Sequence, residues 1–264
     1  MSKLDALSRD GAADVLLQLC AGEARFKELN EAVTNTRTLT KRLKELAAEG
    51  LIKKAGACYM ITSEGFETAL KVVELKEKFG RERVNREELA RIRYGWMRIS
   101  LMRLTELFMK EFGDDLVSIV FYGSAVKGSF QLGRSDVDLF YIVEDDSRNV
   151  WQSEEVVFKG FQSTWEYRAC DYWLKAQGFY GYPEVTTASL QKSHAKKFQP
   201  VYLDMLSHRA VLYDAEDFFQ NLMKKLKEAL KTLGTLRIER PDGTYFWYLK
   251  PDITPGESIE IDLG

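Results

Sequence analysis

The chain has 264 residues, of which 45% are hydrophobic and 30% are charged, a balance that excludes a disordered chain. No run approaches the roughly 20 apolar residues that cross a membrane, and the N-terminus lacks the pattern of a signal peptide, so we expect a cytoplasmic protein. The 38 basic and 40 acidic residues give a net charge of −2, so nucleic-acid binding has to rest on a local cluster of charge. Three scattered cysteines without a CxxC motif and two histidines predict neither a disulfide framework nor a histidine-based metal site.

The first part of the chain carries helix and turn signals in a fixed order. Apolar residues recur at helical spacing within 8–20, 24–33 and 36–48. The segment LIKKAGACYMIT then predicts two short strands around Gly56, and another helix begins near Ser63. Three helices, a hairpin and a fourth helix within about 65 residues are the winged-helix pattern.

A long helical stretch follows this pattern. Residues 65–112 are mostly helical in character, and 82–112, which contain no proline, predict one long helix that connects two domains and packs against both. Its apolar positions are Ile92, Trp96, Ile99, Met102, Leu104 and Leu107. A coiled-coil dimerisation helix is the alternative, although the heptad pattern is not sustained.

The second half of the chain mixes strand and helix signals. The apolar run at 116–122 predicts a strand in a sheet that is covered on both faces, and a second strand at 136–143 follows a glycine-containing loop. An aromatic-rich helix is expected within 150–176, broken near Gly160. The remaining expected elements are a strand at 182–189, a helix and then a strand within 198–213, an amphipathic helix at 215–233, and a Pro-Asp-Gly hairpin in TLRIERPDGTYFWYLK.

An aromatic run, Tyr245-Phe246-Trp247-Tyr248, ends this hairpin. Strand alternation places Phe246 and Tyr248 on one face, and Tyr245 and Trp247 on the other. Core packing or a dimer edge is the favoured interpretation, and a platform on which bases stack is the alternative.

The most specific motif is YGSAVKG followed by SDVDL, between the two apolar strands. Gly123 lets the backbone approach a phosphate closely, and Ser124 offers a hydroxyl and an N–H group to phosphate oxygens. Asp136 and Asp138 lie two apart on a strand, so their carboxylates share a face and repel each other unless a cation lies between them. Such oxygen ligands favour Mg²⁺, which takes a couple of carboxylates together with substrate phosphates and water. The motif therefore predicts a site for metal-assisted phosphoryl or nucleotidyl transfer.

The run GSAVKGSFQLGRSDVDLFYIV resembles the polymerase-β-like nucleotidyltransferase superfamily, and the minimal nucleotidyltransferases of prokaryotes in particular. The later run PVYLDMLSHRAVLYD is similar to the segment that often closes such domains, so that the resemblance covers about 115–215. It implies that the nucleotide triphosphate contacts Gly123, Ser124, Lys127 and Ser135, and that Mg²⁺ is held by Asp136 and Asp138. For Lys127, a solvated surface lysine is the alternative.

Active members of that superfamily have a third carboxylate on a neighbouring strand, which activates the attacking hydroxyl. The sequence does not place this residue cleanly. Glu184 in YPEVTTAS is the best candidate, and we expect it to project toward Asp136 and Asp138. Glu166 and Asp171 are weaker candidates that fit surface charges better.

The second functional signal is local charge in the winged-helix region. Residues 34–54 contain six basic and two acidic residues, a net charge of +4. The third helix can lie in a major groove, with the basic hairpin against phosphates. The residues expected to contact duplex DNA are Arg37, Lys41, Lys44, Lys53 and Lys54. The run RFKELNEAVTNTRTLTKRLKELAAEGLIKK also resembles prokaryotic winged-helix regulators, although such modules can instead serve in dimerisation or protein docking.

Together these signals predict an α+β protein of two domains. A winged helix occupies 1–66, connecting helices 67–114, an α/β nucleotidyltransferase domain with a mixed sheet 115–215, and a helix with a β-hairpin 216–264. The leading function is Mg²⁺-dependent transfer of a nucleoside monophosphate from a nucleotide triphosphate to an acceptor hydroxyl, coupled to DNA binding. The first alternative is a DNA-binding transcriptional regulator whose nucleotidyltransferase-like domain only binds nucleotide or a partner protein. The second is an antitoxin-like partner. The connecting helix and the C-terminal hairpin are the two candidate surfaces for a homodimer.

Overall fold

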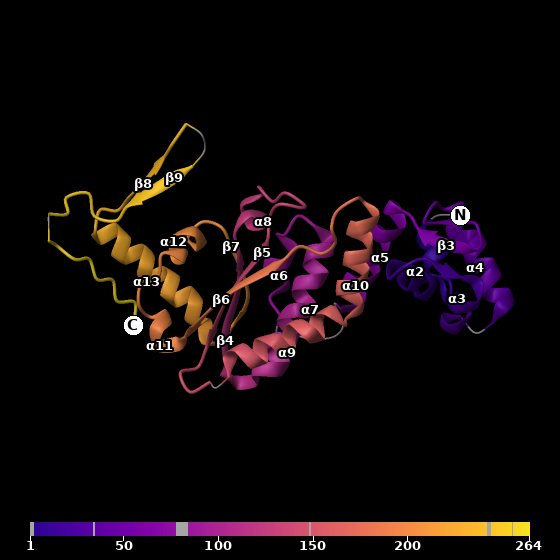
Figure 1. The fold of residues 1–264 in the computed structure, drawn as a ribbon, viewed down its shortest axis with the longest axis horizontal. Helices are drawn as coiled ribbons and strands as arrows, with labels where there is room; N and C mark the ends of the chain where they lie inside the picture. Colours follow the sequence, from indigo (N-terminus) through magenta and orange to yellow (C-terminus); the bar gives the residue numbers. More distant parts are fainter. Residues whose placement is uncertain (1–2, 34, 78–83, 148, 242–243, 255) are drawn as a thin grey trace.

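A computed structural model describes residues 3–33, 35–77, 84–147, 149–241, 244–254 and 256–264. The molecule is elongated, with the N-terminal helices at one end and the C-terminal hairpin at the other (Figure 1). A mixed four-stranded sheet lies between them. Among the described residues, no helix is both long and apolar enough to cross a membrane.

The N-terminal end is a winged helix, as the order of sequence signals predicts. Its elements are α1 (Lys3–Leu7), α2 (Ala12–Cys20), β1 (Ala24–Arg25), α3 (Phe26–Ala32), α4 (Thr36–Ala48), β2 (Ile52–Ala55), β3 (Cys58–Ile61) and α5 (Ser63–Glu77). The strands form an antiparallel sheet in the order β1-β3-β2. Helix α5 contacts α2 and buries Phe66 and Leu70, so the expected boundary at residue 66 falls inside a helix of this core.

The expected long helix over 82–112 is wrong as a single element. Its first two residues lie outside the described part of the chain, and two helices follow: α6 (Arg86–Ala90) and α7 (Gly95–Phe112). The chain turns between them where Arg98 donates hydrogen bonds to the carbonyl groups of Ile92 and Arg93. A Cβ atom added at Gly95 would lie 3.1 Å from Leu70 of α5, which shows how closely α7 starts against the winged helix.

Helix α7 is enclosed by its own chain. It contacts α5 on one side and α9, α10, β4 and β7 on the others. Its buried residues are Trp96, Met97, Ile99, Ser100, Leu101, Leu104, Thr105, Phe108 and Phe112. These side chains are therefore not available for the coiled-coil dimer that the sequence left open.

The central sheet has the order β6-β5-β4-β7. Its strands are β4 (Leu116–Tyr122), β5 (Val137–Val143), β6 (Val185–Gln191) and β7 (Arg209–Asp214), and the short helix α8 (Ser124–Lys127) lies between the first two. Strand β4 is antiparallel to both β5 and β7, whereas β5 and β6 are parallel. The expected mixed sheet is therefore present, with β6 starting at Val185 rather than at residue 182.

Two helices make the crossover from β5 to β6. They are α9 (Val150–Gln162) and α10 (Trp165–Ala176). The expected break near Gly160 occurs instead at Ser163 and Thr164, because the Thr164 hydroxyl accepts a hydrogen bond from the Tyr167 N–H group and caps α10. Both helices lie on the same side of the sheet as α7 (Figure 1).

The opposite face of the sheet is covered by the C-terminal part of the chain. The remaining elements are α11 (Lys192–Ala195), α12 (Val201–Met205), the short 3-10 turn Ala215–Asp217, α13 (Phe218–Thr232), β8 (Leu236–Glu239) and β9 (Tyr245–Tyr248). Phe140 and Ile142 of β5 pack with Tyr202 and Phe219 in this second core. Two residues of the Pro-Asp-Gly turn, 242 and 243, lie outside the described residues.

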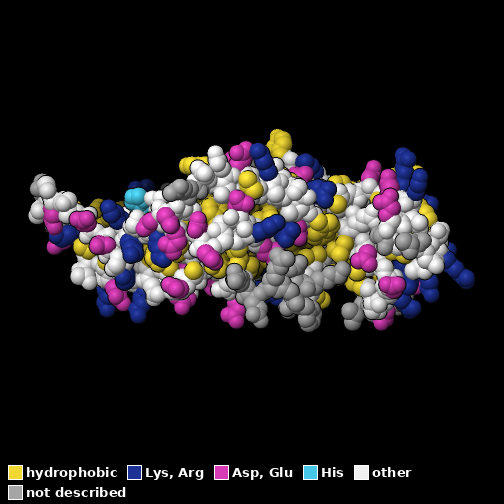
Figure 2. Space-filling view, turned by 90° about the horizontal axis from the view of Figure 1, so that it is seen from below, with side chains coloured by type: hydrophobic (Ala, Val, Ile, Leu, Met, Phe, Trp, Pro, Cys, Tyr) yellow, Lys and Arg dark blue, Asp and Glu magenta, His cyan; other side chains and the backbone are white. Residues whose placement is uncertain are grey.

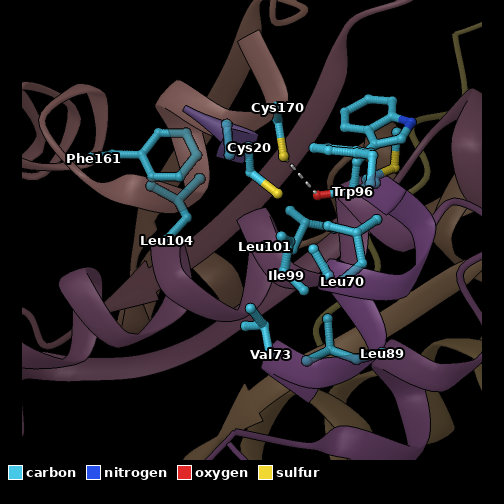
Figure 3. Packing of buried hydrophobic residues seen from close by; sticks show 14 of the residues in the cluster. Cys20, Leu70, Val73, Leu89, Trp96, Ile99, Leu101, Leu104, Phe161 and Cys170 are labelled. Carbon is cyan, nitrogen blue, oxygen red and sulfur yellow. Dashed lines mark hydrogen bonds between the residues drawn. The ribbon is translucent and has the colours of Figure 1, made fainter. Parts of the chain in front are cut away.

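The larger hydrophobic core joins the winged helix to the sheet without interruption. It runs from Leu16 and Phe66 through α7 to Leu139 of β5. Figure 3 shows Cys20 of α2 and Cys170 of α10 beside the start of α7, where the Cys170 thiol donates to the carbonyl group of Trp96. Burial raises the pKa of the Cys170 thiol to about 12, so this thiol stays protonated inside the core.

Two aromatic contacts fasten α10 to the winged helix. The rings of Phe66 and Trp173 stack with centroids 4.5 Å apart. The indole N–H group of Trp165 donates to the carbonyl group of Leu17 over 2.9 Å. A buried aromatic pair of this kind adds to the stabilisation from apolar burial, so we infer that the two domains are held in one orientation.

Replacing Phe66 with alanine should lower the free energy of unfolding by about 3–5 kcal/mol, because the side chain is fully buried and its removal leaves a cavity at the domain contact. The control is Trp151→Ala, since Trp151 is 81% exposed and should change stability by less than about 0.5 kcal/mol. Urea denaturation followed by fluorescence measures both. Equal effects of the two variants would contradict a structural contact at Phe66.

Candidate functional site

Helix α4 presents a basic face to solvent. Leu39, Leu43 and Leu46 are buried against the winged-helix core. Arg37, Lys41 and Lys44 are exposed, as the sequence predicts. Asn35 caps the start of the helix: its side chain accepts a hydrogen bond from the Thr38 N–H group and thereby satisfies one of the free amide groups of the first turn.

The β2–β3 hairpin carries the other two expected DNA contacts. Lys53 and Lys54 are exposed on β2, next to the turn at Gly56. In the described part of the chain, neither these lysines nor the three exposed basic residues of α4 named above form an ion pair. Figure 2 shows Lys and Arg side chains at the outer edge of the winged-helix end of the molecule, with Asp and Glu side chains among them. This face therefore carries uncompensated positive charge, which attracts a polyanion.

Arg42, which contributes to the local charge of +4, does not belong to this face. Its guanidinium group lies 2.7 Å from a carboxylate oxygen of Glu45 and donates to the carbonyl group of Asp10 over 2.8 Å. The arginine therefore ties α4 to the N-terminal segment.

The Gly123–Ser124 turn meets the carboxylate of Asp138 directly. Tyr122 and Asp138 are paired residues of β4 and β5, and Gly123 follows with a φ of 79° and a ψ of −154°, a conformation that suits only glycine. A Cβ atom at Gly123 would lie 2.0 Å from an oxygen of Asp138. The glycine is therefore needed for the turn and for the space that the carboxylate occupies.

The two aspartates form an electrostatically strained pair. Asp136 is exposed just before β5, and Asp138 is half-buried as its second residue. Burial raises the pKa of Asp138, and the nearby negative charge of Asp136 raises it further. A divalent cation would relieve this repulsion, and Mg²⁺ is often held by one or two carboxylates plus substrate phosphates. The donor set therefore fits Mg²⁺ bound together with a phosphate ligand.

Glu184 lies at the same edge of the sheet. Its carbonyl group accepts a hydrogen bond from Val137, and Thr186, two residues later, pairs with Asp138. Strand alternation then puts Glu184 on the face that carries Asp136 and Asp138. Its side chain is exposed, however, and no three acidic, histidine or cysteine side chains of the described residues are grouped so that they could hold a metal ion. The role of Glu184 stays a prediction.

The two serines of the motif differ in their surroundings. Ser124 begins α8 and is partly exposed beside the Gly123 turn. The Ser135 hydroxyl instead accepts a hydrogen bond from the Gln131 N–H group over 3.0 Å and closes the turn that leads to Asp136. Ser135 is thus placed to shape the loop, and Ser124 is the better candidate for a phosphate contact.

Lys127 has two partners that local sequence patterns do not predict. Its ammonium nitrogen lies 3.4 Å from a carboxylate oxygen of Asp204 on α12 and 3.3 Å from the hydroxyl oxygen of Tyr245 on β9. Although burial lowers it, the pKa of Lys127 is raised overall by Tyr245 and Asp204. Both partners lie within segments singled out in the sequence, the PVYLDM run and the aromatic run. They are 77 and 118 residues away from Lys127, however, too far for any spacing rule.

The weaker acidic candidates, Glu166 and Asp171, lie on α10 and not beside β5. Asp171 pairs with Lys175 and accepts a hydrogen bond from the Tyr182 N–H group. Glu166 lies 3.8 Å from Arg103 of α7. Both therefore have structural partners within the helical layer.

Gly123→Ala should destabilise the protein by at least about 2 kcal/mol more than Gly128→Ala, because the first substitution pushes a methyl group into Asp138 and also forces alanine into a backbone conformation that suits only glycine. Gly128 is the control, since it has a similar φ of 80°, lies in the left-handed region with a ψ of 9°, and has nothing within 4 Å of an added Cβ atom. Its alanine variant should lose about 1–2 kcal/mol from backbone strain alone. Chemical denaturation of both variants is the measurement, and equal losses would refute the close approach of Asp138.

Comparisons with known proteins concern the winged helix. A family model described as HxlR-like helix-turn-helix matches residues 12–87, from the start of α2 into α6. An uncharacterised HTH-type transcriptional regulator of Methanocaldococcus jannaschii is 35% identical over 80 residues, which are 28% of this chain and 74% of that protein. No solved structure matches the chain.

The family model ends before α7, so it carries no information on the turn at Gly123 or on Asp138. It does include α4 and the β2–β3 hairpin, which hold all five exposed basic residues described above. Through its N-terminal domain, the chain therefore belongs to the HxlR-like helix-turn-helix family of transcriptional regulators.

Proposed function

We propose that this protein is a transcriptional regulator that binds duplex DNA through α4 and the β2–β3 hairpin. The observation that carries the proposal is the exposed basic face without ion pairs, formed by Arg37, Lys41, Lys44, Lys53 and Lys54, in a domain of a regulator family. The buried leucines of α4 fix which side of the helix faces outward. A helix of this kind fits the major groove, while a basic hairpin contacts the phosphate backbone beside it.

We further propose that the second domain binds a nucleotide triphosphate with Mg²⁺ at the Gly123–Asp138 site. The specific observation that favours this is the contact between the Gly123 backbone and the Asp138 carboxylate, beside a second carboxylate at Asp136. When bound, the metal supplies positive charge that stabilises the phosphate oxygens. Ser124 and Lys127 are the proposed contacts of this chain to those oxygens.

In a regulator, the nucleotide would act as an effector. The family match supports the regulator role and does not extend to the nucleotide site. Nucleotidyl transfer is the second candidate for the same site. There the acceptor oxygen forms a bond to the α-phosphorus, the bond to the bridging oxygen breaks, and pyrophosphate leaves. Glu184 is the candidate base for the acceptor proton, because a hydroxyl group at neutral pH attacks slowly without one. An assay of pyrophosphate release distinguishes transfer from binding alone. If the protein transfers nucleotides, the intact chain should release pyrophosphate from a nucleotide triphosphate, and Glu184→Gln should not.

DNA affinity should fall steeply with salt, since each neutralised phosphate releases counterions. Lys41→Ala should reduce the slope of log affinity against log salt by about one, and Lys41→Ala with Lys53→Ala by about two. Lys159→Ala is the control, because it removes the same charge from a different part of the chain. Lys159 lies on α9, outside the winged helix, and pairs with Glu155. Fluorescence anisotropy with labelled duplex at several salt concentrations is the measurement. No binding at low salt, or an equal effect of Lys159→Ala, would refute the DNA interface.

Asp136→Asn combined with Asp138→Asn should abolish Mg²⁺-dependent binding of a nonhydrolysable nucleotide triphosphate, because the two amides no longer attract a cation. Asp146→Asn is the matched control, since Asp146 is an exposed acid in the loop after β5. Titration calorimetry of the whole chain measures each affinity. If the double variant binds as tightly as the control, the assignment of this site to a metal-bound nucleotide is wrong.

A further inference from the structure

The C-terminal hairpin has two unlike faces. In the register of β8 and β9, Arg237 pairs with Trp247 and Glu239 pairs with Tyr245, so these four side chains share one face. The other face carries Leu236, Ile238, Phe246 and Tyr248. Three residues of this second face are exposed, with Leu236 at 52%, Ile238 at 38% and Tyr248 at 50%. The alternation expected for the aromatic run is confirmed, but its core-packing interpretation does not hold for the outer face.

The face of the hairpin that carries Tyr245, its inner face, reaches Lys127 at the end of α8. The Tyr245 hydroxyl donates a hydrogen bond to Asp204 on α12, and the same carboxylate oxygen lies 3.4 Å from the Lys127 ammonium. The guanidinium of Arg237 stacks over the Tyr245 ring, 4.1 Å from its centroid. In Figure 1 the hairpin stands beside α12, at the end of the molecule away from the winged helix.

The donors and acceptors of this network can be assigned completely. The Tyr245 hydroxyl gives its one hydrogen to Asp204 and accepts one from Lys127. A lysine ammonium has three N–H donors, and two of them have partners in Tyr245 and Asp204. One donor remains for a ligand, and the two fixed bonds restrict the direction in which it points. A charged group held in this way binds an anion without first losing side-chain freedom.

We propose that the β8–β9 hairpin completes the phosphate side of the nucleotide site, with Tyr245 and Asp204 as positioning residues that hold the ammonium group of Lys127 toward the phosphate chain. This inference rests on the proposed nucleotide site and extends it to a segment more than a hundred residues away. The ligand class is a polyphosphate, either free or as the tail of a nucleotide, because the hairpin acts through a point positive charge. Arg237 supports the Tyr245 ring by a cation–π contact.

The test compares two identical chemical changes on one strand. Tyr245→Phe removes the hydroxyl that faces Lys127, and Tyr248→Phe removes one on the exposed outer face. We expect Tyr245→Phe to weaken binding of both Mg²⁺–tripolyphosphate and a nonhydrolysable nucleotide triphosphate by about fivefold, the effect of one hydrogen bond. Tyr248→Phe should leave both affinities unchanged. Calorimetry on the full chain measures them, and thermal unfolding shows whether either variant loses its fold.

A double-mutant cycle with Lys127→Gln separates positioning from a merely structural role. If Tyr245 acts through Lys127, Tyr245→Phe should have no further effect on affinity once Lys127 is glutamine. Additive losses, or equal affinities of Tyr245→Phe and Tyr248→Phe, would overturn the inference. Tripolyphosphate binding that depends on Tyr245, without any nucleotide binding, would support the hairpin's role and refute the nucleotide function. If the unmodified chain binds neither ligand, both the nucleotide site and the role of the hairpin in it are wrong.

Discussion

The architecture depends on the burial of α7 between the two domains. Most of the stability of a helix in a protein comes from the packing of its apolar face, and nine of the 18 residues of α7 are buried. Here α5 covers it from the winged helix, while α9, α10 and two strands cover it from the second domain. Because the apolar core continues from Leu16 to Leu139, the winged helix is not a module on a flexible linker. The basic face of the winged helix therefore has a fixed orientation relative to the sheet.

That arrangement connects the sheet of the second domain to the winged helix by direct contacts. Helix α10 contacts the winged helix through Trp165 and Trp173, and Asp171 on the same helix binds the loop that enters β6. Strand β6 starts beside Asp138. A ligand that shifted β5 or β6 would therefore shift the loop held by Asp171. Through α10 it would also disturb the contacts of Trp165 and Trp173 with α2 and α5. Allosteric coupling between the two sites would be demonstrated by a change in DNA affinity when a ligand binds the second domain.

Local patterns predict much of this fold, and long-range contacts explain what they miss. The leucines of α4, the apolar run of β4 and the amphipathic face of α13 each follow one period, so their elements could be placed from the sequence. The break before Gly95 could not, because it is made by Arg98 and by the approach to Leu70, neither of which has a sequence signature.

The candidate sites divide in the same way. Gly123, Asp136 and Asp138 lie within one short motif, and the structure brings Gly123 against Asp138. Asp204 and Tyr245 come from distant segments that only the folded chain brings to Lys127. Arg42 shows that a count of charges can mislead. It adds to the net charge of the helix, but its guanidinium group is already bound to Glu45. Spacing identifies chemistry within one element, but partners from other elements depend on tertiary packing.

The crossover between β5 and β6 has a consequence for biosynthesis. These strands are parallel, so they cannot pair until the whole α9–α10 segment has left the ribosome. Helix α10 exposes Trp165 and Trp173 unless α2 and α5 are already folded to receive them. Domains generally fold in order of synthesis, N-terminal first, and here that order is useful because the winged helix offers a finished apolar surface when the crossover emerges. A chain that lacked the winged helix would leave this surface of α10 open to aggregation.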